Sequence, residues 1–273
     1  MFAASTLLFV PGSRPDRFAK ARAAGADVTV IDLEDAVAQA DKQGARRAAL
    51  AEVAKGGAWA LRINGIATGH GMADLLALHE SEDLPAYLLI SMVQEARDLE
   101  IVSEVLGERC PRLVPLIETP RGLRHALAIA QVPGVAAMMF GGGDFAGELK
   151  VAMAWEPLQA ARQQLILACA EAGVPAVDVP FTRLDDDPGL AEECAWSRAL
   201  GFSAKAAIHP GQLSAIREAF LPSGAEVAEA EDALQAYSEA GGKALRHNGR
   251  LLEAPLIGHY REIVARSRRQ ADA

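Results

Sequence analysis

Short apolar segments alternate with longer segments of helical pattern along most of this 273-residue chain. The apolar segments are candidate strands because they are short, rich in aliphatic residues and bounded by polar residues, Gly or Pro. They cover residues 6–10, 28–32, 59–63, 86–91, 113–117, 136–140, 175–179 and 204–208. The segments between them, such as KQGARRAALAEVAK and EPLQAARQQLILACAEAG, have helical character, and several end at Gly or before Pro, as helices do.

Eight apolar strands separated by helices predict parallel βαβ units. Eight such units within roughly 200–250 residues predict an α/β fold of the TIM (β/α)8 barrel type. A doubly wound open sheet is the alternative, but no GxGxxG follows the first strand, where a dinucleotide-binding fold would carry one. We therefore expect a barrel that forms the catalytic domain over residues 1–221.

The remaining residues, 222–273, have a different pattern. A helical segment, SGAEVAEAEDALQAYSEAGG, is followed by short β-like runs on either side of Asn248-Gly249, which is a hairpin signal. A basic helix, REIVARSRR, follows. We expect a helix-hairpin-helix extension that packs on its own barrel or on a neighbouring subunit.

Composition narrows the classes of partner. The net charge of −9, with no basic block, argues against a nucleic-acid surface. Three cysteines without metal-like spacing fit a reducing cytosol better than a disulfide framework. The chain has no apolar run of about 18 residues, and no basic leader precedes its first apolar segment. We expect a cytoplasmic protein without a membrane span.

Polar residues gather where the predicted strands end, and in a TIM barrel the C-terminal strand ends carry the catalytic groups. Glu118 follows the fifth strand and Asp144 follows the sixth, so their carboxylates are expected to converge. Two carboxylates with open positions suit Mg²⁺. The alternative is structural: Glu118 pairs with Arg62 in a buried ion bridge, and Asp144 caps a helix.

Arg62 lies near the end of the third strand, where a guanidinium can grip a carboxylate and stabilise charge on an oxygen. Its structural alternative is a partner for Asp32 or Glu34. The acidic cluster of Asp32, Glu34 and Asp35 at the end of the second strand is suited to orienting water on a metal, or equally to capping a helix.

Three basic residues, Arg14, Arg17 and Lys20, follow the first strand. They are candidates for binding the phosphates of a bulky anionic cofactor such as coenzyme A. From the residues alone, a solvated basic helix face is the better interpretation.

Several motifs together resemble the citrate lyase beta-subunit-like proteins of the HpcH/HpaI aldolase family, whose relatives include malyl-CoA and citramalyl-CoA lyases. They are LFVPGSRPDRFAKA, VIDLEDAV with Lys42 and Arg46 after it, LRIN, PLIETPRGL, FGGGDF and AIHPGQ. They occur in the family's order over about residues 5–255.

The resemblance implies a Mg²⁺-dependent TIM-barrel lyase that forms a homo-oligomer, a trimer or hexamer. Glu118 and Asp144 match the family's magnesium ligands, and Arg62 matches its substrate-gripping arginine. The basic residues after the first strand lie in the region that holds coenzyme A. Arg62 and Asp32 are candidate catalytic residues. Glu34 and Asp35 are candidates for contacting the substrate.

Three positions depart from the family pattern. Met92 stands where the fourth strand of relatives carries a lysine, and the strand-six motif has a third Gly. In the tail, Glu253 stands where the acyl-CoA lyases supply an aspartic acid from a neighbouring subunit. Glutamate keeps the acid–base chemistry but moves the carboxyl group, which matters for proton transfer.

The sequence therefore predicts reversible carbon–carbon cleavage of a 3-hydroxyacyl-CoA of the malyl-, citramalyl- or citryl-CoA type, giving an acyl-CoA and a 2-oxo acid. One alternative is an aldolase acting on a free hydroxy-oxo acid. Another is a non-catalytic subunit that binds CoA or an oxo acid within a larger complex, where an acyl-carrier protein is a conceivable partner.

Overall fold

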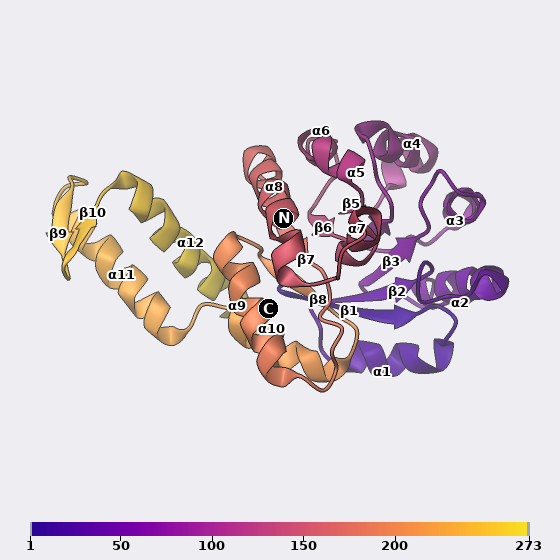
Figure 1. Ribbon diagram of the computed structural model, residues 1–273, viewed down its shortest axis with the longest axis horizontal. Helices are drawn as coiled ribbons and strands as arrows, with labels where there is room; N and C mark the ends of the chain where they lie inside the picture. The colour runs from indigo at the N-terminus through magenta and orange to yellow at the C-terminus, as the bar shows by residue number, and fades with distance from the viewer. Residues whose placement is uncertain (1, 272–273) are drawn as a thin grey trace. The chain divides into compact units, whose positions relative to one another are not determined.

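A computed structural model describes residues 2–271 and contains a closed barrel of eight parallel strands (Figure 1). The barrel strands are β1 (Thr6–Pro11), β2 (Val28–Asp32), β3 (Trp59–Ile63), β4 (Tyr87–Ile90), β5 (Arg112–Ile117), β6 (Met138–Phe140), β7 (Ala176–Asp178) and β8 (Ala204–Ala207). Each strand pairs with the next, and β1 closes the barrel against β8, with Thr6 opposite Lys205. All eight predicted strands are present, and the predicted TIM barrel is confirmed.

Helices follow the strands and lie around the outside of the barrel (Figure 1). They are α1 (Phe18–Ala23), α2 (Lys42–Val53), α3 (Gly69–Glu80), α4 (Ala96–Leu106), α5 (Pro120–Arg124), α6 (Ala126–Ala130), α7 (Gly142–Leu149), α8 (Trp155–Ala172), α9 (Asp187–Leu200) and α10 (Leu213–Phe220). Short 3₁₀ turns occur at Pro15–Arg17, Gln39–Asp41, Gly107–Arg109 and Pro210–Gln212. Thr68 and Thr119 cap α3 and α5 through their side chains, which satisfies donors at those helix starts.

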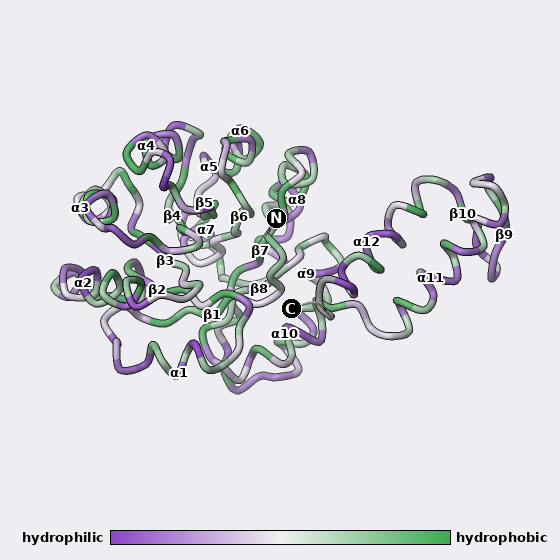
Figure 2. The backbone as a smooth tube through the Cα atoms, turned by 180° about the vertical axis from the view of Figure 1, so that it is seen from behind, coloured by the Kyte–Doolittle hydropathy of each residue, from purple (hydrophilic) through white to green (hydrophobic). Residues whose placement is uncertain are grey.

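The strands are buried on both faces, as a parallel sheet covered by helices requires. One contiguous apolar cluster draws members such as Leu7, Ala60, Leu89 and Val177 from strands all round the barrel and fills its interior. Figure 2 shows hydrophobic colour concentrated along the strands, whereas the outer helices alternate between the two colours. This double burial explains why the strands are continuous apolar runs in the sequence rather than alternating ones.

A buried network of charges joins β7 and β8 to the helices outside them. Asp178 accepts hydrogen bonds from Arg162 Nε at 2.9 Å, Ser197 Oγ at 2.5 Å and Lys205 Nζ at 2.8 Å. Burial raises the pKa of Asp178, but Lys205 and Arg162 lower it more strongly, to about 2. Lys205 also donates to Glu193 at 2.7 Å, so the network is electrically balanced.

The chain divides into two compact units, Met1–Ile216 and Arg217–Ala273, with the boundary inside α10. In the second unit, α11 (Gly224–Glu239) packs on α12 (Ala254–Ala271), and β9 (Leu245–His247) pairs with β10 (Arg250–Leu252). The predicted hairpin is present, with Asn248 and Gly249 at φ 45° and 79°, the two positive values that a tight hairpin turn requires. Packing of this unit on a neighbouring subunit stays a prediction.

None of the helices in the described part of the chain is both long and apolar enough to cross a membrane.

Candidate active site

A cavity of about 440 Å³ opens at the C-terminal ends of the barrel strands. Its charged lining comes from β3, from the ends of β2 and β5 and the residues just after them, and from α7; it consists of Asp32, Asp35, Arg62, Glu118 and Asp144. The rest of the wall is mostly apolar and includes Phe9, Leu116 and Met139. The barrel thus brings together, in one cavity, charged residues from Asp32 to Asp144, which lie 112 positions apart in the chain (144 − 32).

Arg62 is held in a carboxylate clamp. Asp32 and Arg62 are opposite one another in the β2–β3 register, and the guanidinium donates from Nε and Nη2 to the two oxygens of Asp32, both at 2.6 Å. Nη1 lies 2.9 Å from Glu34 Oε2 and 3.5 Å from Asp35 Oδ2. The aromatic ring of Phe9 lies 5.3 Å from the guanidinium carbon. Burial lowers the pKa of Arg62, but these carboxylates raise it above its ordinary value.

Asp32 has its hydrogen-bonding capacity taken up by the protein. Besides the guanidinium, its two oxygens accept from the backbone N–H of Glu34 at 2.9 Å and of Ala36 at 3.2 Å. These bonds shape the loop after β2 and do not cap a helix, because the next helical turn starts only at Gln39 and α2 at Lys42. The structure therefore favours a positioning role for Asp32 over direct contact with substrate.

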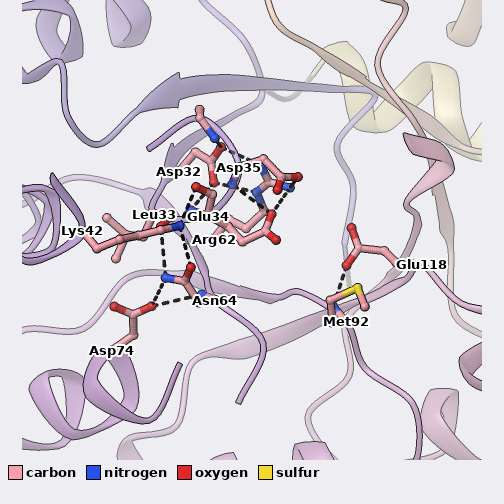
Figure 3. A network of polar contacts seen from close by, with 11 residues as sticks. Asp32, Leu33, Glu34, Asp35, Lys42, Arg62, Asn64, Asp74, Met92 and Glu118 are labelled. Atoms are coloured by element: carbon pink, nitrogen blue, oxygen red, sulfur yellow. Dashed lines mark hydrogen bonds and ion pairs between the residues drawn. The ribbon is translucent and has the colours of Figure 1, made fainter. Parts of the chain in front are cut away.

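A second set of contacts fixes the same loop from below (Figure 3). Lys42 Nζ donates to the carbonyls of Leu33 at 2.9 Å and Glu34 at 2.7 Å, and to Asn64 Oδ1 at 2.7 Å. Asn64 donates in turn to Asp74 at 2.6 Å. A lysine buried in this way rigidifies the acidic loop, because each of its donors has a fixed acceptor.

Glu118 is nearly inaccessible, with 2% of its surface exposed. One of its oxygens accepts the backbone N–H of Met92 at 2.5 Å, as Figure 3 shows. The structural alternative for Glu118 was a buried ion pair with Arg62. Within residues 2–271 this pair is not formed, because Arg62 pairs with Asp32 and with the loop after β2. Burial raises the pKa of Glu118 to about 8; Glu34 and Asp144 add to the rise, while the Met92 N–H and Arg62 oppose it.

Asp144 lies in the first turn of α7, where a carboxylate is favourable for the helix, and it also faces the cavity. Its pKa is raised by burial and by Asp35, with Arg62 opposing. The carboxylate oxygens of Glu34, Asp35 and Asp144 lie within 4.8 Å of one another. Burial raises the pKa of Glu34 to about 7, and Arg62 limits the rise.

The donor set fits a divalent cation. Five carboxylates gather around the single guanidinium of Arg62, and two of them, Glu34 and Glu118, have pKa values raised to about 7 and about 8. Excess negative charge of this kind is relieved by a proton or by a cation, and oxygen-only donors are the set that Mg²⁺ prefers. Glu118 lines the same cavity as Asp144 but is not part of the close group of Glu34, Asp35 and Asp144, and its pairing with Asp144 on one ion stays a prediction.

A second cavity of about 550 Å³ adjoins the first. Arg17 and Lys20 line it, and it shares Phe9, Pro11 and Ile208 with the acidic cavity. Arg14, the third predicted cation, is not in its wall and instead pairs with Asp16 at 2.7 Å on the surface. Of the three basic residues, Arg17 and Lys20 therefore line this cavity and Arg14 does not.

Glu253 belongs to the second unit, where it is exposed immediately before α12. Its backbone carbonyl accepts the first hydrogen bonds of that helix, from Leu256 and Ile257. Its predicted role as an acid supplied by a neighbouring subunit stays a prediction.

Comparison with known proteins identifies the architecture. The model of the HpcH/HpaI aldolase/citrate lyase family matches residues 5–210, which is most of the chain. The chain belongs to the HpcH/HpaI aldolase/citrate lyase family. This confirms the resemblance inferred from the motifs.

Three relatives are informative. The chain is 33% identical to a (3S)-malyl-CoA thioesterase of Cereibacter sphaeroides, covering 96% of this chain and 94% of that protein. It is 34% identical to the L-malyl-CoA/beta-methylmalyl-CoA lyase of Rhodobacter capsulatus, with 94% and 92% covered. The crystal structure of CitE from Mycobacterium tuberculosis with magnesium, acetoacetate and coenzyme A aligns with a TM-score of 0.84 at 30% identity, covering 97% and 98%.

Some elements of this candidate site escaped sequence reasoning. Gly141 approaches Glu118 so closely that a β-carbon there would lie 2.1 Å from Glu118 Cγ. The Met92 N–H donates a hydrogen bond to the same carboxylate; this depends on the φ angle of Met92, which the sequence does not indicate. Only the run of three glycines before Asp144 hinted that backbone comes close to something at this point.

Proposed function

We propose that the chain is a Mg²⁺-dependent carbon–carbon lyase that cleaves a 3-hydroxyacyl-CoA, of the malyl-, citramalyl- or citryl-CoA type, to an acyl-CoA and a 2-oxo acid. The observation that carries the proposal is the junction of two cavities. One holds the clamped Arg62 and the acidic residues, and the other, sharing part of its wall, holds Arg17 and Lys20.

The relatives support the same chemistry. One is named a lyase of malyl-CoA, and another was crystallised with magnesium, an oxo acid and coenzyme A. Because a third is named a malyl-CoA thioesterase, hydrolysis of the thioester is the second candidate activity.

Glu118 and Asp144 are the proposed magnesium ligands, with Asp35 close enough to orient water around the ion. When bound, Mg²⁺ supplies a Lewis acid that polarises the hydroxyl and carboxylate oxygens of the substrate. Because Glu118 is buried, water competes little for its carboxylate oxygens, and the low local dielectric constant strengthens their attraction for a cation.

Arg62 is the proposed electrostatic stabiliser. With Nε and Nη2 fixed on Asp32, the guanidinium is oriented before substrate arrives, so it pays little reorganisation when negative charge develops on an oxygen in the cavity. Asp32 is therefore a positioning residue in this proposal, and Glu34 and Asp35 balance the charge of Arg62 in the free protein.

Arg17 and Lys20 are the proposed ligands of the CoA phosphates, since both line the cavity next to the acidic one. In the proposed cleavage the substrate hydroxyl gives its proton to a carboxylate of the acidic cavity and becomes the carbonyl of the 2-oxo acid, while the electron pair of the broken carbon–carbon bond passes to the thioester as its enolate. Glu253 from a neighbouring subunit is the proposed acid that protonates the α-carbon of this enolate, and the base that removes the proton in condensation.

The direct test is incubation of the full chain with Mg²⁺, acetyl-CoA and glyoxylate, pyruvate or oxaloacetate, followed by mass spectrometry for the thioester adduct and by thiol titration for free CoA. We expect an adduct with one of the three oxo acids, lost on chelation of the metal. Free CoA without adduct would identify a thioesterase. Binding of Mg²⁺ with no thioester reacting in either direction would refute the lyase proposal, and calorimetric binding of CoA without any product would favour a binding subunit.

Neutralising the cations separates the thioester reaction from an aldolase that uses a free acid. The double variant Arg17→Ala/Lys20→Ala is expected to raise the KM for acyl-CoA by about tenfold or more, because charge-assisted hydrogen bonds to phosphate are lost. Arg14→Ala is the comparison variant, since Arg14 itself is not in the wall of this cavity, although its partner Asp16 is. Unchanged kinetics in the double variant would favour the free hydroxy-oxo acid as substrate.

A further inference from the structure

Met92 has a backbone conformation that ordinary side chains avoid. Its φ is 57°, in the left-handed region, where a β-carbon crowds the following carbonyl. Two other non-glycine residues in the described part of the chain have a positive φ, and each lies at a position where this is usual. Lys150 ends α7 in a left-handed cap, and Asn248 forms the hairpin turn. Met92 does neither, because it lies in the connection between β4 and α4.

The unusual conformation aims the Met92 N–H at Glu118. The amide donates to Glu118 Oε2 at 2.5 Å. Within residues 2–271, no second hydrogen bond to this buried carboxylate is present, so one oxygen is held while the other has no protein donor. In Figure 3 this pair stands apart from the network around Arg62.

Two glycines allow the segment carrying Met92 to approach its neighbours. A β-carbon on Gly122 would lie 2.4 Å from the carbonyl oxygen of Val93. A β-carbon on Gly65 would lie 3.1 Å from that of Met92. The connection is therefore pressed between the end of β3 and the start of α5, which over-determines its backbone as a strained conformation requires.

The Met92 side chain has no part in the cavity wall, which leaves the backbone as the functional element. On the other side of Glu118, Gly141 leaves no room for a β-carbon, with Glu118 Cγ only 2.1 Å from where it would lie. Glu118 is thus confined between a backbone donor and a backbone wall.

We propose that Met92 is a positioning residue that acts through its main chain: its left-handed backbone fixes one oxygen of Glu118 so that the other is presented to a divalent cation. The inference rests on the proposed function, in which Glu118 is a ligand of Mg²⁺. It predicts that the identity of the side chain at position 92 matters only through the backbone angles it permits.

The test compares Met92→Gly with Met92→Val in the full chain. Glycine adopts positive φ freely, whereas a β-branched residue opposes it. We expect Met92→Gly to bind Mg²⁺ within about threefold of the wild type, and Met92→Val to bind it about tenfold or more weakly, the effect of losing a hydrogen bond to a charged group. Isothermal titration calorimetry with Mg²⁺ alone gives the dissociation constants.

Lys150→Val is the matched control, because it opposes the same φ of 57° at an exposed position without touching Glu118. It is expected to lower the melting temperature as Met92→Val does, and to leave the dissociation constant for Mg²⁺ unchanged. Wild-type affinity in folded Met92→Val, or an equal loss in Met92→Gly, would overturn the inference.

Failure of the positioning role of Met92 can be distinguished from failure of the proposed magnesium site. If the wild type itself binds no Mg²⁺, the metal assignment fails, and crystal structures of the two variants then decide the positioning role. We expect Glu118 to keep its bond to the residue-92 N–H in Met92→Gly and to lose it in Met92→Val. Retention of that bond in both variants would count against the inference.

Discussion

Binding of Mg²⁺ at Glu118 is expected to release a proton near neutral pH. Burial raises the pKa of this carboxyl from 4.5 to about 8, so at pH 7 about nine-tenths of the metal-free protein carries the proton there. A cation that takes the same oxygen must displace it. The affinity for Mg²⁺ should therefore rise by about tenfold from pH 6 to pH 7 and level off above pH 8.

The same shift sets the pH dependence of folding without metal. The folded state binds this proton more tightly than the unfolded state, so the contribution of Glu118 is most favourable below pH 4.5 and is lost as the pH rises to about 8. The full shift corresponds to at most about 5 kcal/mol. Mg²⁺ should restore this loss at high pH, because it binds only the folded site.

Calorimetry in PIPES, HEPES and Tris, whose ionisation enthalpies differ, measures the released proton directly. We expect about one proton per Mg²⁺ at pH 7, and close to none at pH 9.5 in buffers of higher pKa such as CHES and ethanolamine. Glu118→Gln should weaken binding by about tenfold or more, since an uncharged ligand replaces a carboxylate. A dissociation constant that stays flat from pH 6 to pH 9, with no proton released, would refute the reasoning.

Three substitutions probe the rest of the barrel unit. Asp32→Asn breaks the clamp and should lower the free energy of unfolding by about 2–3 kcal/mol, as measured in urea, and lower kcat because Arg62 loses its orientation. Gly141→Ala should displace Glu118 and weaken Mg²⁺ binding by about tenfold or more, measured by calorimetry. Asp178→Ala leaves buried cations unpaired and should cost about 3–5 kcal/mol of unfolding free energy.

Each of these has an outcome that would contradict it. Gly143→Ala is the control for Gly141→Ala, because a β-carbon at Gly143 meets open space; equal effects of the two would show that crowding of Glu118 is not the cause. An unchanged kcat in Asp32→Asn would remove Asp32 from the positioning of Arg62. Wild-type stability in Asp178→Ala would mean that the buried charges are solvated in some other way.

The barrel and the hairpin could be predicted because local pattern encodes them. A strand covered by helices on one face and by the barrel interior on the other must be apolar throughout, so its run of residues is visible in the sequence. The turn at Asn248-Gly249 is equally local, since only a few residues tolerate two successive positive φ values. Glu118, Asp144 and Arg62 were also identifiable, because a charged residue at the end of an apolar strand needs a reason to be there.

The choice of partners could not be predicted in this way. The sequence left Glu118, Asp32 and Glu34 as candidate partners of Arg62; the β2–β3 register sets Asp32 opposite Arg62, and the loop after β2 adds Glu34. The N–H that donates to Glu118 comes from Met92, 26 positions away in the chain. It depends on a positive φ, which a methionine in the sequence does not indicate.

The sequence by itself determined which segments are buried, where they turn and which end of the barrel carries charge, because burial and turn geometry act on neighbouring residues. Only the tertiary structure decided which carboxylate clamps the arginine, which cations line the second cavity and what holds Glu118. These depend on strand register and on backbone approaching within a few ångströms across distant segments, which no local pattern records.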